Sequence, residues 1–297
     1  MSQEPNQAHA SSAPVALLGT GLLGEAIGLR LLQQGVPLRV WNRNAERAQQ
    51  LVDRGAQRID QLQGASLGCG AVISVLRDGP STASVLGQLG ELGGTTVLTM
   101  GTMGIGESIA LGQQLQQQGG QLLEVPVQGS RPEALAGTLI LMAAGAEPLF
   151  QQQLPLLRHL SEQPKWVGPL GSGAAMKLAL NQLIASLSHG FSLALHLIQS
   201  AEVPVEAFMA VLRDSALYAP TFDKKLSRML ANNYANPNFS TALLHKDLAL
   251  FLRDAKTAGL ETSGLDGLAT LLSQAQARQL ADLDYSALHR LTAGSGE

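Results

Sequence analysis

The sequence predicts an α/β protein: a doubly wound, mainly parallel sheet domain followed by an all-α C-terminal domain. Short apolar runs alternate with helix-like stretches in the first half, and a glycine turn follows the first run. From Ser172 onward the apolar residues follow a 3.6-residue period. The 297 residues, of which 45% are hydrophobic and 14% charged, suffice for two domains. We place these domains at residues 14–170 and 171–292.

The composition narrows the classes of partner. Twenty basic and 23 acidic residues give a net charge of -3 without a basic cluster, so we expect no nucleic-acid partner. The single cysteine, Cys69, excludes an intramolecular disulfide and fits a reducing compartment. Residues 1–13 lack the basic start and apolar core of a secretory signal and predict a disordered tail. We therefore expect a cytoplasmic protein.

The first expected element is a buried strand that ends in a glycine turn. Residues 14–18 form a continuous apolar run, and residues 25–35 follow as a helix. Between them, Gly19 permits a tight turn, Gly21 lets the backbone approach a pyrophosphate, and Gly24 allows close packing of helix on strand. In this strand–turn–helix context, a Rossmann-type dinucleotide site is favoured over a purely structural turn. The expected cofactor-binding residues here are Gly19, Thr20, Gly21, Leu22, Leu23 and Gly24.

The end of the second expected strand, residues 37–41, bears on the choice of cofactor. An NAD site usually places Asp or Glu at this point, whereas a 2′-phosphate favours neutral or basic side chains. Asn42, Arg43 and Asn44 follow the strand, so the sequence favours NADP(H). The alternative is that Arg43 only faces solvent.

Two further apolar runs, residues 71–76 and 95–100, continue the alternation of strands and helices. Ligands of an open parallel sheet bind beyond the carboxyl ends of its strands, which places Leu76, Arg77 and Thr102 near the cofactor. From the residues alone, Thr102 is equally well interpreted as a loop hydroxyl.

Two more strands are expected at residues 122–130 and 138–145, joined by a loop over residues 131–137.

The second half predicts helices at residues 173–200 and 204–214, with more beyond positions 242 and 264. The first of these helices is apolar on nearly every side and needs cover all round, so we expect a homodimer. Polar residues interrupt its apolar run, which favours a buried or interface helix over a membrane span. His189 and His196 have no Cys or carboxylate near them in the sequence, so we expect no metal site.

Lys177 is the only Lys, Arg, Asp or Glu between Lys165 and Glu202. Burying an ammonium group costs free energy unless it is paired, so the charge either reaches water or serves a polar pocket. Asn181 follows four residues later and shares its helix face. The residues alone leave the two interpretations about equal.

Together these residues resemble the β-hydroxyacid dehydrogenase family, which includes 3-hydroxyisobutyrate dehydrogenase and the glyoxylate and succinic semialdehyde reductases. The resemblance spans roughly residues 15–259 and implies a Rossmann domain, a helical domain, an active site between them, and a dimer or higher oligomer. Four motifs carry it, in order: Gly19-Thr-Gly-Leu-Leu-Gly24, Glu124-Val-Pro-Val-Gln-Gly-Ser130, Gly171-Ser-Gly-Ala-Ala-Met-Lys177 with Asn181, and Phe239 followed by His245-Lys-Asp-Leu-Ala-Leu250.

The resemblance also implies roles for single residues. Lys177 matches the family's catalytic lysine, Asn181 its substrate-positioning asparagine, and Lys246 a lysine that reaches the cofactor. A protonated lysine suits this chemistry, because hydride addition to a carbonyl builds negative charge on oxygen. The cofactor is also expected to meet Thr102, and the substrate to meet Gln128, Gly129, Ser130, Phe239 and Asp247. We further expect Asp247 to help keep a lysine charged.

Three departures from the family pattern alter the expected pocket. Gln128 stands where the family usually has Ser, Leu180 replaces the first of two asparagines, and Thr99 and Gly101 replace Asp and Ser. A bulkier or less strictly acidic substrate therefore also fits.

The resulting hypothesis is an NADP(H)-dependent oxidoreductase that reduces a small aldehyde acid, such as glyoxylate or succinic semialdehyde, or oxidises a 3-hydroxyacid, with Lys177 as proton donor. Two alternatives stay open. Residues 40–43 and 47–56 also resemble imine reductases, although Lys177 argues against that activity. The other alternative is a non-catalytic NADPH-binding sensor or scaffold.

Overall fold

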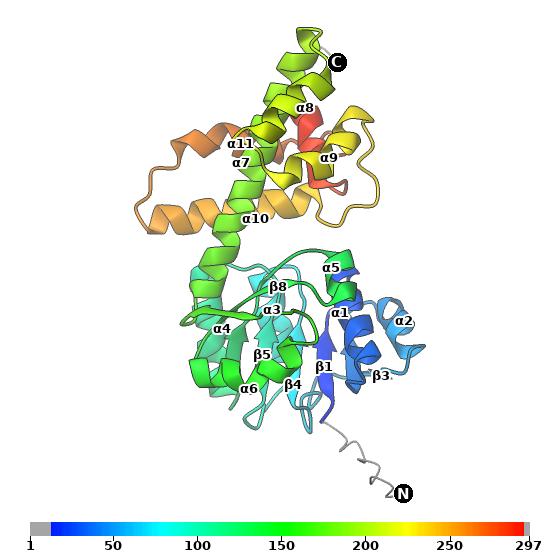
Figure 1. Cartoon of the computed structure of the whole chain (residues 1–297). Coiled ribbons are helices and arrows are strands. Elements are labelled where there is room, and N and C mark those ends of the chain that lie inside the picture. Colours follow the sequence, from blue (N-terminus) through cyan, green and yellow to red (C-terminus); the bar gives the residue numbers. More distant parts are fainter. Residues whose placement is uncertain (1–12, 294–297) are drawn as a thin grey trace, which may run out of the picture. The chain divides into compact units, whose positions relative to one another are not determined.

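A computed structural model describes residues 13–293, so all but the last residue of the predicted tail at residues 1–13 lies outside the described residues. Contacts divide the chain into two compact units between Ala174 and Ala175 (Figure 1). The domain limits expected from the sequence, at residues 14, 170 and 292, stay predictions.

A mixed sheet organises the first unit. Its order is β3-β2-β1-β4-β5-β6-β8-β7, with β9 paired to β8. The strands β1 to β6 are parallel to one another, whereas β8 is antiparallel to β6. The strands are β1 (Val15–Leu18), β2 (Leu38–Trp41), β3 (Gln57–Arg58), β4 (Ala71–Ser74), β5 (Thr96–Thr99), β6 (Gln121–Glu124), β7 (Val127–Gln128), β8 (Ile140–Ala144) and β9 (Lys165–Gly168). The strand order reverses between β1 and β4, which confirms the doubly wound topology. In such sheets, ligands bind at this reversal, beyond the carboxyl ends of the strands.

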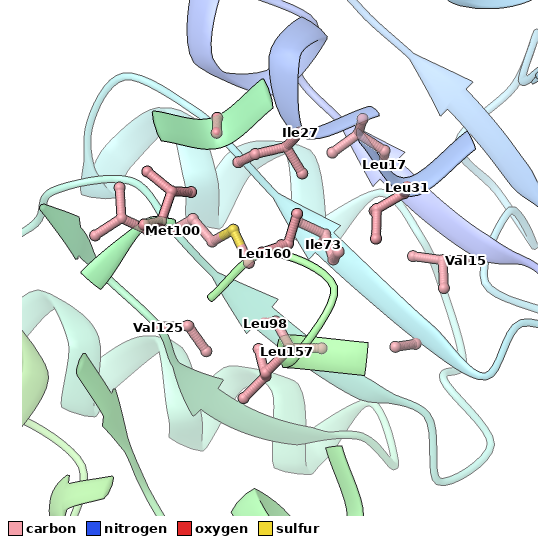
Figure 2. Close-up of a cluster of buried hydrophobic side chains, with 14 of the residues drawn as sticks. Val15, Leu17, Ile27, Leu31, Ile73, Leu98, Met100, Val125, Leu157 and Leu160 are labelled. Atoms are coloured by element: carbon pink, nitrogen blue, oxygen red, sulfur yellow. The ribbon is translucent and has the colours of Figure 1, made fainter. Parts of the chain in front are cut away.

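Helices cover both faces of this sheet. They are α1 (Leu22–Gln33), α2 (Gln49–Val52), α3 (Gly79–Gly87), α4 (Ile105–Gln117), α5 (Arg131–Ala136) and α6 (Glu147–Leu157), with a 3-10 turn η1 (Ala45–Ala48). Alternate residues of a strand point to opposite faces. Val15 and Leu17 therefore join a core with α1 and α6 (Figure 2), whereas Ala16 and Leu18 join a core with α3 and α4.

Two sequence expectations in this unit are wrong. Residues 122–130 do not form one strand, because Pro126 has no N–H to donate; β6 ends before it and β7 pairs with β8 instead. Residues 131–137 are not a loop but the helix α5, which ends at Gly137 with φ 75°. The strands β3 and β9 were not expected, since neither has a buried side chain.

The second unit is helical, as predicted. Its helices are α7 (Ser172–Ser200, which begins in the first unit), α8 (Val205–Asp214), α9 (Pro220–Leu230), α10 (Thr241–Thr257), α11 (Asp266–Ser273) and α12 (Leu288–Thr292), with the 3-10 turns η2 (Ser263–Leu265) and η3 (Tyr285–Ala287). Ala185 of α7 packs into one core with α10 and α11, and Phe191 of α7 into another with α8 and α9. Phe191 stacks on Phe222 of α9 at 4.6 Å between ring centroids.

The helix α7 is also the one helix among residues 13–293 that is long and apolar enough to cross a membrane. That test uses length and composition alone, and the core helix of a soluble protein passes it too. Of its 18-residue apolar window, 39% is buried inside the structure. The side chains of Ala185, Phe191 and Leu195 lie in the two helical cores.

Candidate active site

The glycine loop after β1 has no space for a side chain at Gly19 or Gly24 but has open space at Gly21. Gly19 has φ 99°, and a Cβ there would clash with the carbonyl oxygen of Val75. A Cβ at Gly24 would clash with the carbonyl oxygen of Gly19, whereas one at Gly21 would meet no protein atom within 4 Å. Gly21 caps α1 without a side-chain hydrogen bond. Among the residues that the structure describes, the backbone N–H groups at this helix start have no side-chain cap, which suits a pyrophosphate.

The residues around Thr20 fit a dinucleotide as well. The Thr20 hydroxyl is buried and has no hydrogen-bond partner within the part of the chain that the structure describes. The Thr20 N–H donates to Asn42 Oδ1 at 3.3 Å, and Asn42 Nδ2 donates to the carbonyl oxygen of Asn44 at 2.8 Å. These two asparagines thus connect the end of β2 to the glycine loop. Arg43 between them is exposed and forms no ion pair or hydrogen bond within residues 13–293.

The loops after β4 and β5 run very close together. A Cβ at Gly101 would clash with the carbonyl oxygen of Leu76, which gives a physical reason for glycine where the resemblance leads one to expect serine. Leu76 and Thr102 are partly buried, and Arg77 is exposed. The structure therefore brings Leu76 next to the residue that precedes Thr102, at the carboxyl edge of the sheet.

The expected substrate loop, residues 128–130, already contacts an internal carboxylate. The Ser130 N–H and hydroxyl both donate to Glu133 Oε2, at 2.8 and 2.9 Å. Gly129 has φ 113°, and Gln128 is partly buried. The neighbouring cation, Arg131, donates to Glu25 at 3.1 Å. The Ser130 N–H and hydroxyl, which the sequence offers to a substrate carboxylate, are thus engaged by Glu133 of the chain itself.

In the helical unit, α7 and α10 bring four polar side chains together: Lys177, Asn181, Lys246 and Asp247. Asn181 Nδ2 donates to Asp247 Oδ2 at 2.5 Å, and Lys246 Nζ lies 2.7 Å from Asp247 Oδ1. Asn181 and Asp247 are each 1% exposed, so this pair is shielded from water, whereas the Lys246 side chain is 18% exposed. We call these four residues the lysine quartet.

The quartet also sets the proton affinity of Lys177. Burial lowers the pKa of Lys177 to about 8, because desolvation disfavours the ammonium form. The Asp247 carboxylate opposes this shift, and the Lys246 ammonium adds to it. A lysine with this pKa is protonated near neutral pH and can still release its proton, as a general acid must.

Phe239 and the histidines have other contacts. The Phe239 ring packs edge-on against Tyr285 at 5.8 Å between centroids, and its place in a substrate pocket stays a prediction. His196 stacks on His289 at 3.9 Å, and burial together with the His196 charge lowers the pKa of His289 to about 4. Among residues 13–293, no three His, Cys, Asp or Glu side chains are grouped so that they could hold a metal ion.

One buried acid was not selected from the sequence. Glu124, at the end of β6, is 2% exposed, and its Oε2 accepts hydrogen bonds from Gly171 N–H at 3.0 Å and Gly173 N–H at 3.1 Å. The sequence signal was present, because Glu124 is the only charged residue in the apolar run 122–127. An acid inside an apolar strand needs partners, and these partners lie almost fifty residues away in the chain.

Comparison with known proteins assigns the family. Residues 14–168 match the NAD binding domain of 6-phosphogluconate dehydrogenase, and residues 171–292 match the family described as NAD-binding of NADP-dependent 3-hydroxyisobutyrate dehydrogenase. Glyoxylate/succinic semialdehyde reductase 1 of Arabidopsis thaliana is 30% identical over 281 residues, which cover 92% of this chain and 96% of that protein. The chain belongs to the β-hydroxyacid dehydrogenase family.

As a β-hydroxyacid dehydrogenase, the chain is an NAD(P)-binding oxidoreductase. Its fold recurs in solved structures. Mycobacterium tuberculosis 3-hydroxyisobutyrate dehydrogenase with L-serine has a TM-score of 0.83 at 22% identity, over 94% of this chain and 98% of that one. An imine reductase from Pseudomonas sp. has a TM-score of 0.62 at 21% identity, over 95% and 100%. At these identities the likeness shows the fold alone.

Proposed function

We propose that this β-hydroxyacid dehydrogenase is an NADP(H)-dependent reductase of a small aldehyde acid, of the glyoxylate or succinic semialdehyde kind. The observation that carries the proposal is Lys177, whose pKa is about 8 beside the buried Asn181–Asp247 pair. The activity named for the Arabidopsis relative supports the substrate class. The same chemistry in reverse oxidises a hydroxyacid.

The quartet residues have separate roles in this reaction. NADPH, when bound, would supply a hydride for the carbonyl carbon, and the negative charge would then develop on the carbonyl oxygen. Lys177 stabilises that charge and transfers its proton to the oxygen, which yields the alcohol. Asn181, held by Asp247, orients the substrate oxygen, and Asp247 keeps Lys177 protonated. Lys246 and Thr102 contact the cofactor.

The first test is NADPH oxidation against glyoxylate, succinic semialdehyde, methylglyoxal, simple aldehydes and a cyclic imine. We expect turnover of an aldehyde acid, with kcat lower by about 10²- to 10⁴-fold in Lys177→Ala, because general-acid catalysis is typically worth that much. Turnover of the cyclic imine alone would favour imine reduction. Tight NADPH binding with no turnover at all would favour a sensor or scaffold.

The cofactor preference rests on Arg43, an exposed guanidinium at the end of β2. We propose that it contacts the 2′-phosphate of NADP(H). Arg43→Ala should weaken NADPH binding by about 10- to 100-fold, as expected for a charge-assisted hydrogen bond, and leave NADH binding unchanged. Arg47→Ala, at another exposed arginine nearby, is the matched control. Equal losses for both cofactors in Arg43→Ala would contradict the preference.

We also propose a homodimer, with α7 at its interface. Leu183, Leu187, Leu193 and Leu197 are 50%, 39%, 49% and 68% exposed, and their spacing places them on one side of α7. A second copy would cover this apolar stripe, because exposed apolar residues that are grouped on one face often mark an interaction surface. Leu187→Glu should dissociate the dimer in sedimentation experiments, whereas Leu67→Glu, at an exposed leucine of the first unit, should not.

The same stripe raises the membrane alternative, so the test needs a second arm. We propose a cytoplasmic protein without membrane or nucleic-acid partners, and its purified form should not float with liposomes or shift a DNA or RNA probe. Flotation that Leu187→Glu abolishes would replace the dimer with membrane attachment through α7.

A further inference from the structure

Glu124 is a buried carboxylate at the carboxyl end of a central strand. It pairs in register with Thr99 of β5 on one side and Ala144 of β8 on the other, so its backbone is fixed by the sheet. Its side chain is directed at the start of α7, where Oε2 accepts the Gly171 and Gly173 N–H groups at 3.0 and 3.1 Å. The strand thus supplies a cap to a helix that begins 48 residues later.

The start of α7 is built for this contact. The first turn of α7 contains no acidic residue, so Glu124 is the acid that meets its N–H groups. A Cβ at Gly173 would lie 3.0 Å from Glu124 Oε2 and 3.2 Å from the Met142 carbonyl oxygen, so a larger residue would require these neighbours to shift. Gly171 has φ 95°, a conformation that side chains disfavour.

Burying a carboxylate carries a desolvation cost, which its hydrogen bonds from Gly171 and Gly173 offset in part. Burial raises the pKa of Glu124, although the nearby Ser108 hydroxyl and the hydrogen bonds from the Gly171 and Gly173 N–H groups oppose the shift. We therefore look for the role of Glu124 in the geometry that it imposes on the start of α7, and not in a contribution to the stability of the fold. Lys177 lies four residues after Gly173, one turn along the same helix.

We propose that Glu124 is a positioning residue for Lys177. By accepting hydrogen bonds from the N–H groups of Gly171 and Gly173, it keeps the first turn of α7 folded. The second turn, which carries Lys177, is then held in place, so that Lys177 stays on the same helix face as Asn181. This inference rests on the proposed reductase function, because it assigns Glu124 a role in presenting the proton donor. Glu124 itself contacts backbone and not the reacting atoms.

The test compares Glu124→Leu, which removes the acceptor, with Glu124→Gln, which keeps a carbonyl oxygen. Leu86→Ala is the control for lost stability, because it opens a cavity on the fully buried α3 face of the same unit. For each protein we would measure kcat, KM, the NADPH dissociation constant and amide hydrogen exchange at residues 173–177. The rate of Lys177 acetylation by acetic anhydride reports on Lys177 without any substrate.

We expect Glu124→Leu to lower kcat by more than about 10-fold, with NADPH affinity unchanged, faster exchange at residues 173–177 and altered Lys177 acetylation. Glu124→Gln should recover most of kcat. Leu86→Ala should lower the melting temperature without any of these changes. A Glu124→Leu protein whose kcat, exchange and acetylation all match the wild type would overturn the inference. If the wild type reduces no carbonyl, the reductase proposal fails, while exchange and acetylation still decide the role of Glu124.

Discussion

The glycine loop of the first unit and the lysine quartet of the second act by opposite physical means. The loop uses backbone N–H groups and empty space: Gly19 and Gly24 are needed because a Cβ has no room, and Gly21 leaves an open approach. The quartet uses buried charge, since two lysines and one aspartate share a site with Asn181. We therefore expect the loop to be sensitive to added atoms and indifferent to pH, and the quartet to show the reverse.

The largest effect is expected when Lys177 of the lysine quartet is replaced. Lys177→Met should lower kcat by about 10²- to 10⁴-fold and yet raise the free energy of unfolding near pH 7, because a buried ammonium is replaced by an apolar chain of similar length. A pKa lowered from 10.5 to about 8 sets the upper limit of this gain at about 3 kcal/mol. Chemical unfolding of both proteins at several pH values measures it.

The sign of the pH dependence of this stability gain follows from the lowered pKa of Lys177. Between about pH 8 and 10.5 the unfolded state of the wild type binds more protons at Lys177 than the folded state does, so its stability rises with pH in that window. The advantage of Lys177→Met should be complete below pH 8 and should vanish near pH 10.5. An advantage that stays constant across this window would mean that Lys177 is not desolvated.

The next effect concerns the loop and should not depend on pH. Gly24→Ala forces a Cβ against the Gly19 carbonyl oxygen, so we expect NADPH binding to weaken by at least about 100-fold together with a lower melting temperature, since the backbone has to move. Gly21→Ala should weaken NADPH binding while the melting temperature stays unchanged, because its Cβ meets no protein atom. Calorimetric titration and thermal melting separate the two; equal melting losses would contradict the open approach at Gly21.

Within the quartet, two charge removals should move the same pKa in opposite directions. Asp247→Asn removes the carboxylate that raises the Lys177 pKa, so the fall of kcat/KM with rising pH should begin below pH 8. Lys246→Met removes the ammonium that lowers the Lys177 pKa, so the fall should begin above pH 8. Each shift should be about one pH unit, or about tenfold in rate at a fixed pH. Shifts of the same sign would show that Lys177 does not govern the profile.

The same contrast explains what the sequence could predict. The loop is a local feature: strand, turn and helix are contiguous, so periodicity and glycine spacing were enough to locate Gly19, Gly21 and Gly24. The doubly wound topology followed from the repeated alternation. The splitting of residues 122–130 was missed although Pro126 was visible, because β7 is set by its antiparallel partner β8.

The quartet is not local, and the sequence supplied only part of it. The shared helix face of Lys177 and Asn181 follows from helix spacing. The contact of Asn181 with Asp247 on α10 was not predicted, because the family resemblance implied only that Asp247 belongs to the site. The hydrogen bond from the Gly173 N–H to Glu124 joins residues 49 positions apart in the chain, and it was not predicted. The Ser130–Glu133 cap lay within three residues and could have been read, because Ser followed three positions later by Glu is a helix-start signature.

The smallest effect is expected at the Ser130–Glu133 cap, where a charged carboxylate accepts a hydrogen bond from a backbone N–H group. Glu133→Gln keeps an acceptor for Ser130 and removes a negative charge, so the preference for succinic semialdehyde over butanal in kcat/KM should rise by about 3- to 10-fold, since like charges repel. The rise should shrink at high salt, where exposed charges are screened. Glu107→Gln, in the capping box of α4, is the matched control and should leave the preference unchanged. If Glu133→Gln leaves it unchanged as well, the substrate carboxylate does not meet residues 128–130.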